Sequence, residues 1–352
     1  MKQITVQVHP TYGVLVGEGL LDRLGELSAG VSAGRRAAVI TDDTVDGLYG
    51  GRAVRSLEGA GFSACKYVFP HGEGSKNLAV WGSILAFLAE NRLTRSDLVV
   101  ALGGGVTGDM AGFAAACYLR GISFVQVPTT LLAAIDSSVG GKTAVDLPQG
   151  KNLAGAFHQP ALVLCDPLTL DTLPPDTLAD GMAEAVKTGI IGDKALFELL
   201  RRESLSPEDR TEIILRCVEL KRALVERDER DHGDRQLLNL GHTMGHGVEK
   251  LSGYRISHGQ AVAMGTAAMA RAAWRAGLSW EDNAPAIIRA LERRGLPTAC
   301  PYGAGELAAA ALSDKKRSGG RITVVIPERI GHSALHTMAV EELEGLFALG
   351  LE

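Results

Sequence analysis

An apolar run, Asp97 to Leu102 (DLVVAL), leads directly into Gly103-Gly104-Gly105 and then into a helical stretch, Asp109 to Tyr118. Gly103, Gly105 and Gly108 fit the pattern G-x-G-x-x-G in the strand, turn and helix setting that it requires. Glycines at such a turn let the backbone approach a pyrophosphate, and the helix N-terminus favours its negative charge. The segment predicts a nucleotide site in an α/β domain, with a tight structural turn as the alternative.

Two departures separate this turn from familiar nucleotide sites. An acidic residue normally follows about 20 residues later to hold the ribose, but Gly121 to Val127 contains none. Asp42, at the end of an earlier predicted strand, could supply that acid instead. No Gly-Lys-Ser/Thr sequence closes the turn, which excludes a phosphate loop of the nucleotide-hydrolase kind.

Strands and helices alternate through the first half of the chain. Other short apolar runs predict strands at Arg36–Thr41, Lys66–Phe69 and Ser123–Val127, and the N-terminal residues Met1–Val8 alternate like a strand. Continuous apolar strands alternating with helices indicate a parallel sheet covered on both faces.

Long helical patterns dominate the second half, and Pro174-Pro175 marks the change. We therefore expect an α/β domain over residues 1–173 and a mostly helical domain over residues 174–352. The predicted helices are Leu178–Ile191, Pro207–Arg227, Arg235–Leu251, Gln260–Gly277 and Asp282–Arg294, with a strand at Arg321–Ile326.

Glycines beside lysines and hydroxyl groups suit an anion. Thr129 and Thr130 follow a predicted strand, and open α/β sheets bind ligands at such ends. The segments Asp136 to Thr143 (DSSVGGKT) and Gly150-Lys151-Asn152 offer backbone N–H groups and ammonium groups. A solvated glycine loop is the alternative interpretation.

Arg235, Asn239, His242 and His246 would share one face of a single helix. Such a face is costly to bury against apolar partners, so we expect it to line a cavity. Spacing alone pairs His242 with His246 as metal ligands, with Glu184 as a candidate carboxylate beside Lys187 at i+3. Isolated histidines are more often structural, and Ser257-His258-Gly259 is the weaker candidate.

Charge and cysteine content limit the partners and the compartment. The formal net charge of −5 disfavours nucleic acid or anionic membranes as partners. The five scattered cysteines form no CxxC pair, and no apolar stretch is long enough to span a bilayer. We expect a cytoplasmic protein.

Five long motifs resemble those of 3-dehydroquinate synthases, in order along nearly the whole chain. They are GGGVTGDMAGFAAACYLRG (103–121), VPTTLLAAIDSSVGGKTAVDLPQGKNLAGAFHQP (127–160), GMAEAVKTGII (181–191), RQLLNLGHTMGHGVE (235–249) and SHGQAVAMG (257–265). The resemblance implies a Rossmann-like NAD-binding α/β domain followed by an α-helical domain that binds metal and substrate. It also implies a homodimer that uses NAD and Zn²⁺ or Co²⁺ to convert 3-deoxy-D-arabino-heptulosonate 7-phosphate to 3-dehydroquinate and phosphate.

The resemblance also implies roles for individual residues, and it replaces the pairing of His242 with His246. The metal ligands would be Glu184, His242 and His258. Catalytic or substrate contacts would be Asp136, Lys142, Asn152, Lys187, Lys221, Arg235, Asn239, His246 and one of Lys315 and Lys316, with Arg120 reaching across the dimer interface. NAD contacts would be Asp42, Glu73, Lys76, Gly104, Gly105, Val106, Asp109, Thr129, Thr130, Lys142, Lys151, Thr169, Leu170 and Thr172.

Other sugar phosphate cyclases are the main competitors. Cyclases of substrates without a carboxylate generally change the positions of Arg235 and Asn239, and deoxy-inosose synthases tend to have Glu at the latter. This chain keeps both residues, which favours a carboxylate-bearing substrate, plain or amino-substituted. A silent NAD- or metal-binding protein and an NAD-dependent alcohol dehydrogenase of similar architecture remain as alternatives. Two departures are Gln260, where an acid is usual, and His158, where an aromatic residue is common.

Overall fold

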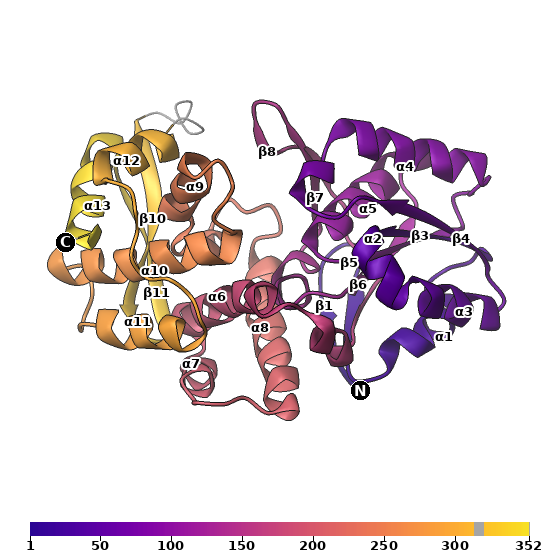
Figure 1. Cartoon of the computed structure of the whole chain (residues 1–352), viewed down its shortest axis with the longest axis horizontal. Helices are drawn as coiled ribbons and strands as arrows, with labels where there is room; N and C mark the ends of the chain where they lie inside the picture. Colours follow the sequence, from indigo (N-terminus) through magenta and orange to yellow (C-terminus); the bar gives the residue numbers. More distant parts are fainter. Residues whose placement is uncertain (313–319, 352) are drawn as a thin grey trace. The chain divides into compact units, whose positions relative to one another are not determined.

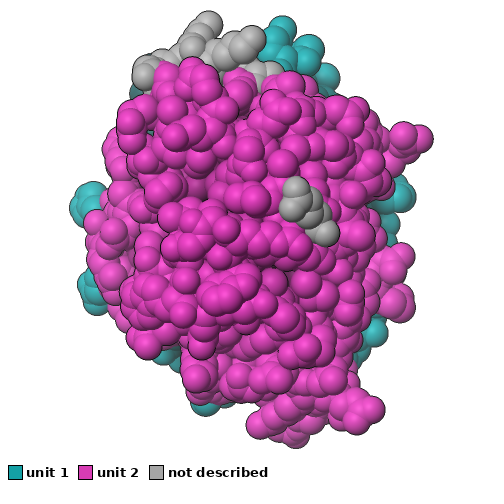
Figure 2. All heavy atoms as spheres, turned by 90° about the vertical axis from the view of Figure 1, so that its left-hand side faces the viewer, with its two compact units in different colours: residues 1–173 teal, residues 174–352 magenta. Residues whose placement is uncertain are grey.

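The computed structural model describes residues 1–312 and 320–351. The chain divides into two compact units, Met1–Leu173 and Pro174–Glu352, so the division falls at the Pro174-Pro175 pair (Figures 1 and 2).

Unit 1 is built on a seven-stranded sheet in the order β1-β2-β9-β6-β5-β3-β4. Its strands are β1 (Lys2–Val6), β2 (Tyr12–Val16), β3 (Arg36–Asp42), β4 (Ser63–Phe69), β5 (Leu98–Gly103), β6 (Ser123–Pro128) and β9 (Leu162–Cys165). All neighbouring pairs are parallel except β1 and β2, which form an antiparallel edge.

Alternate strand residues enter two apolar cores, one on each face of the sheet. Val39 and Val100 pack on the face covered by α1 (Leu24–Ala29) and α3 (Gly51–Gly59). Ile40 and Val99 pack on the face covered by α4 (Leu78–Glu90) and α5 (Gly105–Cys117). Because both faces are covered, the strands contain continuous apolar runs, and the predicted α/β fold is confirmed.

From Lys142 onward, the segments predicted to suit an anion form an antiparallel hairpin, which differs from the alternative interpretation of a solvated glycine loop. Its strands are β7 (Lys142–Leu147) and β8 (Gly150–Phe157), which pair in register from Lys142 with Phe157. A Cβ atom on Gly155 would lie 2.2 Å from the Thr143 carbonyl oxygen, so glycine is needed for the close pairing of the strands. Glycines permit close packing of strands as well as loop formation, which is why the loop interpretation is wrong here, whereas the anion site stays a prediction.

Unit 2 is mostly helical, as the sequence predicts. Its helices are α6 (Pro175–Gly192), α7 (Lys194–Leu200), α8 (Pro207–Arg227), α9 (His242–Leu251), α10 (His258–Arg275), α11 (Ala284–Arg293), α12 (Ala304–Leu312) and α13 (Leu343–Leu351). Strand β10 (Arg321–Arg329) pairs with β11 (His332–Ala339), a strand that the sequence analysis did not predict. Within the described residues, no helix is sufficiently long and apolar to cross a membrane.

The single helix predicted for Arg235–Leu251 is wrong. A 3-10 turn, η7 (Asp234–Asn239), ends at Leu240 with ψ of +126°, and α9 begins only after Gly241 with φ of +78°. Glycine commonly occupies the left-handed position at the end of a helix, because a residue with a side chain is strained in that conformation. Arg235 and Asn239 therefore do not lie on the same helical face as His242 and His246.

Candidate functional site

The turn after β5 forms the N-terminus of α5, with Gly104 as its N-cap. A Cβ atom on Gly104 would lie 3.1 Å from Thr130 Cγ2, and one on Gly105 would lie 3.2 Å from Ser137 Oγ. Bare backbone N–H groups at the start of a 13-residue helix, next to Val106, suit an anion. The structure thus keeps the strand, turn and helix setting that the glycine pattern needs.

Several predicted cofactor residues follow strands that are parallel neighbours in the sheet. Asp42 ends β3, Thr129 and Thr130 follow β6, and Thr169, Leu170 and Thr172 lie in η6 (Pro167–Thr172), just after β9. The carboxyl ends of parallel neighbours lie at one edge of a sheet, so the fold gathers these residues around the glycine turn. Asp42 Oδ1 accepts a hydrogen bond from the Val45 amide at 2.9 Å, which fixes the carboxylate.

Lys76 connects the glycine-turn helix with the β7–β8 hairpin. Its buried Nζ lies 2.7 Å from Asp109 Oδ2 on α5 and 2.6 Å from Asn152 Oδ1 on β8. Burial acts to lower the pKa of Lys76, but the neighbouring carboxylates, Asp109 first, raise the pKa overall. The ammonium group therefore stays charged and holds both side chains.

The remaining predicted residues of unit 1 lie on the hairpin and on two short helical turns. Lys142 begins β7, and Lys151 Nζ on β8 lies 3.5 Å from Glu73 Oε1. Asp136 is half-buried in η5 (Ala133–Ser137). Arg120 is exposed, with a left-handed φ of +70°.

His158, one of the two departures from the motifs, packs and hydrogen-bonds within unit 1. His158 stacks on Phe124 with ring centroids 5.3 Å apart and 15° between the planes, and its Nε2 bonds the Ile122 carbonyl at 2.9 Å.

Three helices of unit 2 bring Glu184, His242 and His258 together. Glu184 lies on α6, and the two histidines begin α9 and α10. Their donor atoms lie within 4.8 Å of one another, with Glu184 Oε1 3.6 Å from His242 Nε2 and 3.3 Å from His258 Nε2. Two imidazoles and a carboxylate form a ligand set typical of a catalytic zinc ion with open positions.

Small residues allow these helices to approach closely. A Cβ atom on Gly265 of α10 would lie 2.1 Å from the Gly241 carbonyl oxygen, and one on Gly259 would lie 2.3 Å from Asp180 Cα on α6. Ser257 Oγ donates a hydrogen bond to Asp180 Oδ1 at 2.5 Å, one helical turn before Glu184. These contacts fix the helix starts that present both histidines.

The Glu184 carboxylate is 1% exposed, and neither oxygen has a hydrogen-bond partner of good geometry within the described residues. Burial acts to raise the pKa of Glu184, but the ammonium of Lys187, with which it forms an ion pair, and the two imidazoles lower the pKa well below its usual value. Burial, assisted by Lys187, lowers the pKa of His242 to about 3. A buried, ionised carboxylate facing a neutral imidazole is the state that a cation requires of its ligands.

His258 differs from His242 in its surroundings. Burial acts to lower its pKa, but Glu184 and Glu249 raise the pKa to about 10. A cation that uses this imidazole therefore displaces a proton.

Other predicted residues of unit 2 lie on neighbouring elements. Lys187 on α6, Lys221 on α8 and Arg235 in η7 are buried, and His246 on α9 is exposed. The Arg235 guanidinium donates to the Glu229 carbonyl at 2.7 Å. Lys315 and Lys316 lie outside the described residues.

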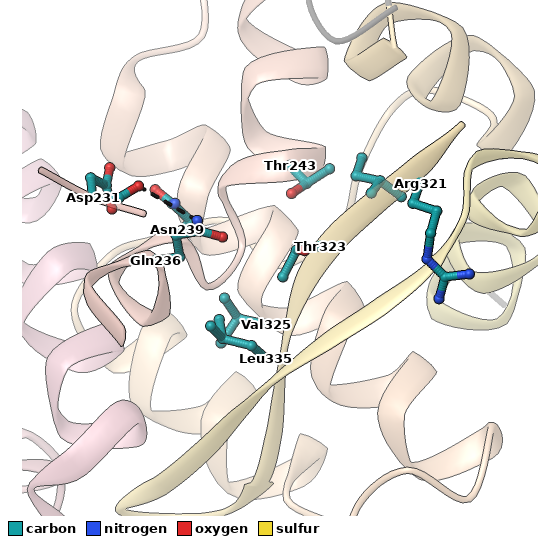
Figure 3. A pocket seen from close by; sticks show the side chains of 9 residues that line it. Asp231, Gln236, Asn239, Thr243, Arg321, Thr323, Val325 and Leu335 are labelled. Carbon is teal, nitrogen blue, oxygen red and sulfur yellow. Dashed lines mark hydrogen bonds between the residues drawn. The ribbon is translucent and has the colours of Figure 1, made fainter. Parts of the chain in front are cut away.

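Asn239 lines a cavity of about 400 Å³ within unit 2. Figure 3 shows Asn239, Thr243 and Thr323 around it, with the apolar Val325 and Leu335 together at one end. Of the four residues expected to line a cavity together, Arg235, Asn239, His242 and His246, only Asn239 lines this one; Thr243, which follows His242 on α9, lines it as well.

Sequence reasoning missed Glu249, whose Oε2 lies 3.4 Å from His258 Nδ1. The signal was present, because His242, His246 and Glu249 follow the helical spacing i, i+4 and i+7 on α9. It also missed Asp180 and Asp146, which act through tertiary contacts that no spacing predicts.

Two family models match the chain. The model described as "3-dehydroquinate synthase N-terminal" matches residues 66–180, and the one described as "3-dehydroquinate synthase C-terminal" matches residues 181–317.

Similar proteins match over almost the whole chain. The 3-dehydroquinate synthase of Streptococcus suis (strain 05ZYH33) is 44% identical over 97% of this chain and 98% of its own. A 2-deoxy-scyllo-inosose synthase solved with carbaglucose-6-phosphate, NAD⁺ and Co²⁺ is 26% identical, with a TM-score of 0.87 over 99% of each chain. A 2-epi-5-epi-valiolone synthase from Streptomyces hygroscopicus subsp. jinggangensis 5008, solved with NAD⁺ and Zn²⁺, is 27% identical, with a TM-score of 0.86 over 99% of this chain and 98% of its own.

Proposed function

The chain belongs to the 3-dehydroquinate synthase family, and we propose that it converts 3-deoxy-D-arabino-heptulosonate 7-phosphate to 3-dehydroquinate and phosphate. The observation that supports this best is the group of Glu184, His242 and His258 in a chain that also keeps Arg235 and Asn239. The reaction class is a phosphate-eliminating lyase that closes a carbocycle.

NAD is the proposed cofactor of unit 1. The bare backbone of Gly104 and Gly105 leaves room for a pyrophosphate that a Cβ atom would restrict, and Asp42 ends the strand next to β5. When bound, NAD⁺ would supply a temporary acceptor for the hydride of the substrate's C5 hydroxyl carbon, and a hydride that is given back to the substrate would leave no net NADH. Thr129, Thr130, Lys151 and the residues of η6 would orient the cofactor.

A divalent cation, Zn²⁺ or Co²⁺, is the proposed partner of Glu184, His242 and His258. The buried Glu184 carboxylate, whose Oε1 faces the Nε2 atoms of both histidines, fits such a cation. Bound there, it supplies Lewis acidity to the substrate's hydroxyl and ketone oxygens.

The cationic side chains of this chain would bind the two anionic ends of the substrate. Lys187 and Lys221 are buried cations, and an ammonium group binds a carboxylate or a phosphate through charge-assisted hydrogen bonds. Arg235 can bind a carboxylate in a bidentate manner, which point-charged lysine cannot. Asn239 would assist Arg235 at the carboxylate end. Lys142, Asn152 and His246 would contact the rest of the substrate, and Asp136 would help to position it.

A homodimer completes the proposal. Arg120, exposed on the short turn that follows α5, would contact the phosphate bound by the partner subunit.

The test is a product assay with the heptulosonate phosphate, NAD⁺ and Zn²⁺. We expect phosphate release and 3-dehydroquinate without net absorbance from NADH. Parallel assays with the amino-substituted heptulosonate phosphate separate the two carboxylate-bearing substrates by kcat/KM. Steady NADH accumulation would contradict the proposal and indicate a dehydrogenase.

A further inference from the structure

We propose that Glu249 is a positioning residue that fixes the ring nitrogen through which His258 binds the metal. The inference rests on the proposed metal site of Glu184, His242 and His258. It concerns a residue on α9 that lies beside that set and outside it.

The two nitrogens of His258 face two different carboxylates. Nε2 lies 3.3 Å from Glu184 Oε1, and Nδ1 lies 3.4 Å from Glu249 Oε2. A neutral imidazole has one N–H group and one lone pair. An acceptor at Nδ1 selects the tautomer with its proton there, so a cation that displaces the proton of Nε2 finds the lone pair of that nitrogen beside Glu184.

His242 shows the same arrangement with a different acceptor. Its Nδ1 lies 3.1 Å from the Leu240 carbonyl oxygen, and its Nε2 lies 3.6 Å from Glu184 Oε1. Both histidines thus present Nε2 to one carboxylate oxygen while a second acceptor holds Nδ1. The backbone holds one ring, and the Glu249 side chain holds the other.

Glu249 is unusual because its carboxylate is buried. It is 4% exposed, and a carboxylate is seldom buried without a charged or hydrogen-bonded partner. The Ser252 hydroxyl and the Tyr254 amide both donate to its backbone carbonyl at 2.8 Å, which fixes the end of α9. The helix therefore holds the carboxylate in place toward the imidazole.

A second metal ion is the competing interpretation, because His246, Glu249 and His258 also have donor atoms within 4.8 Å. That site would need the lone pair of His258 Nδ1, which a neutral ring does not offer while Nε2 binds the first metal. His246 is also exposed, whereas Glu184 is buried. The single lone pair of neutral His258 therefore serves one metal ion per chain, with Glu249 as an acceptor.

The experiment measures Zn²⁺ affinity of the metal-free full chain by competition with a chelator, and Zn²⁺ stoichiometry by calorimetry. We expect Glu249→Ala to weaken binding about 10- to 100-fold. Glu249→Gln keeps the size and an acceptor oxygen but loses the charge, so its loss should be smaller. If Glu249→Ala does not fold, Glu249→Gln alone decides, and wild-type affinity in it overturns the proposal.

Glu328→Gln is the matched control, because it removes a carboxylate 3.3 Å from His332 Nε2, outside the proposed site. Its Zn²⁺ affinity should equal that of the wild type. His258→Ala tests the metal site itself and should lose Zn²⁺ binding, whereas His246→Ala should keep it.

These variants separate the two possible failures. Unchanged binding in His258→Ala would refute the proposed metal site. Loss in His258→Ala with wild-type affinity in both Glu249 variants would refute only the role of Glu249. Two Zn²⁺ ions per wild-type chain, with one lost in Glu249→Ala, would establish the second metal site and overturn the inference.

Discussion

Gly241 shows at the scale of one residue how the backbone prepares a ligand. It takes a φ of +78°, which ends η7 and lets α9 begin at His242. A Cβ atom there would lie 2.3 Å from Thr266 Oγ1 and 2.7 Å from the Val262 carbonyl oxygen, both on α10. The residue thus needs glycine for two separate reasons, conformation and packing.

We expect Gly241→Ala to lower the free energy of unfolding by about 2–4 kcal/mol, since left-handed strain adds to overpacking. Urea denaturation measures the loss. Gly253→Ala is the control, because Gly253 also has a left-handed φ, +61°, but no atom lies within 4 Å of its Cβ position. Its loss should be only about 1–2 kcal/mol. Equal losses in the two variants would show that packing at Gly241 contributes nothing.

At the scale of elements, the β7–β8 hairpin is tied to the loop before α4 by a ring of three hydrogen bonds. The Asp146 amide donates to the Lys76 carbonyl at 2.8 Å, Lys76 Nζ donates to Asn152 Oδ1, and the Asn152 amide donates to Asp146 Oδ1 at 2.8 Å. The ring supports Asn152 at a left-handed φ of +57°. Burial raises the pKa of the Asp146 carboxyl.

We expect Asp146→Ala to speed amide hydrogen exchange in β8 about tenfold, because opening one hydrogen bond becomes easier by roughly 1–1.5 kcal/mol. Asp146→Asn keeps an acceptor oxygen and should retain most of the protection. Mass spectrometry of peptides that cover residues 150–157 gives the readout. Equal exchange in Asp146→Ala and wild type would mean that the hairpin does not depend on this ring.

At the scale of the whole molecule, the proposed dimer makes a prediction about shared sites. Consider a dimer of one Arg120→Ala subunit and one Lys187→Ala subunit. If Arg120 contacts the partner's substrate, the site of the first subunit is complete, because it has its own Lys187 and the partner's Arg120. Each variant alone should have little activity. Random mixing of the two should restore about one quarter of wild-type activity, since half of the dimers are mixed and each has one complete site.

The mixing experiment uses variants that are denatured and refolded together, with phosphate release as the readout. Refolding each variant alone is the control for recovery. A mixture no more active than the separate variants would place Arg120 in its own subunit's site.

The sequence alone determined the α/β unit and the helical unit that follows it. A strand that is buried on both faces, such as β5, contains a continuous apolar run, and a helix that is buried on one face, such as α8, contains apolar residues at helical spacing. Both patterns are local and can be read from the sequence. The glycine turn after β5 was predictable for the same reason, since its strand, turn and helix are contiguous. Long motifs also indicated the family before the fold was known.

Only the tertiary structure decided which side chains meet. The spacing of His242 and His246 predicted a ligand pair, but Glu184, His242 and His258 come from three helices whose approach depends on glycines far apart in the chain. The break at Gly241 and the pairing of the glycine-rich segment into β7 and β8 depend in the same way on close contacts. The spacing of residues along the chain shows whether one segment is a helix or a strand, whereas a site depends on the distances between residues of different elements.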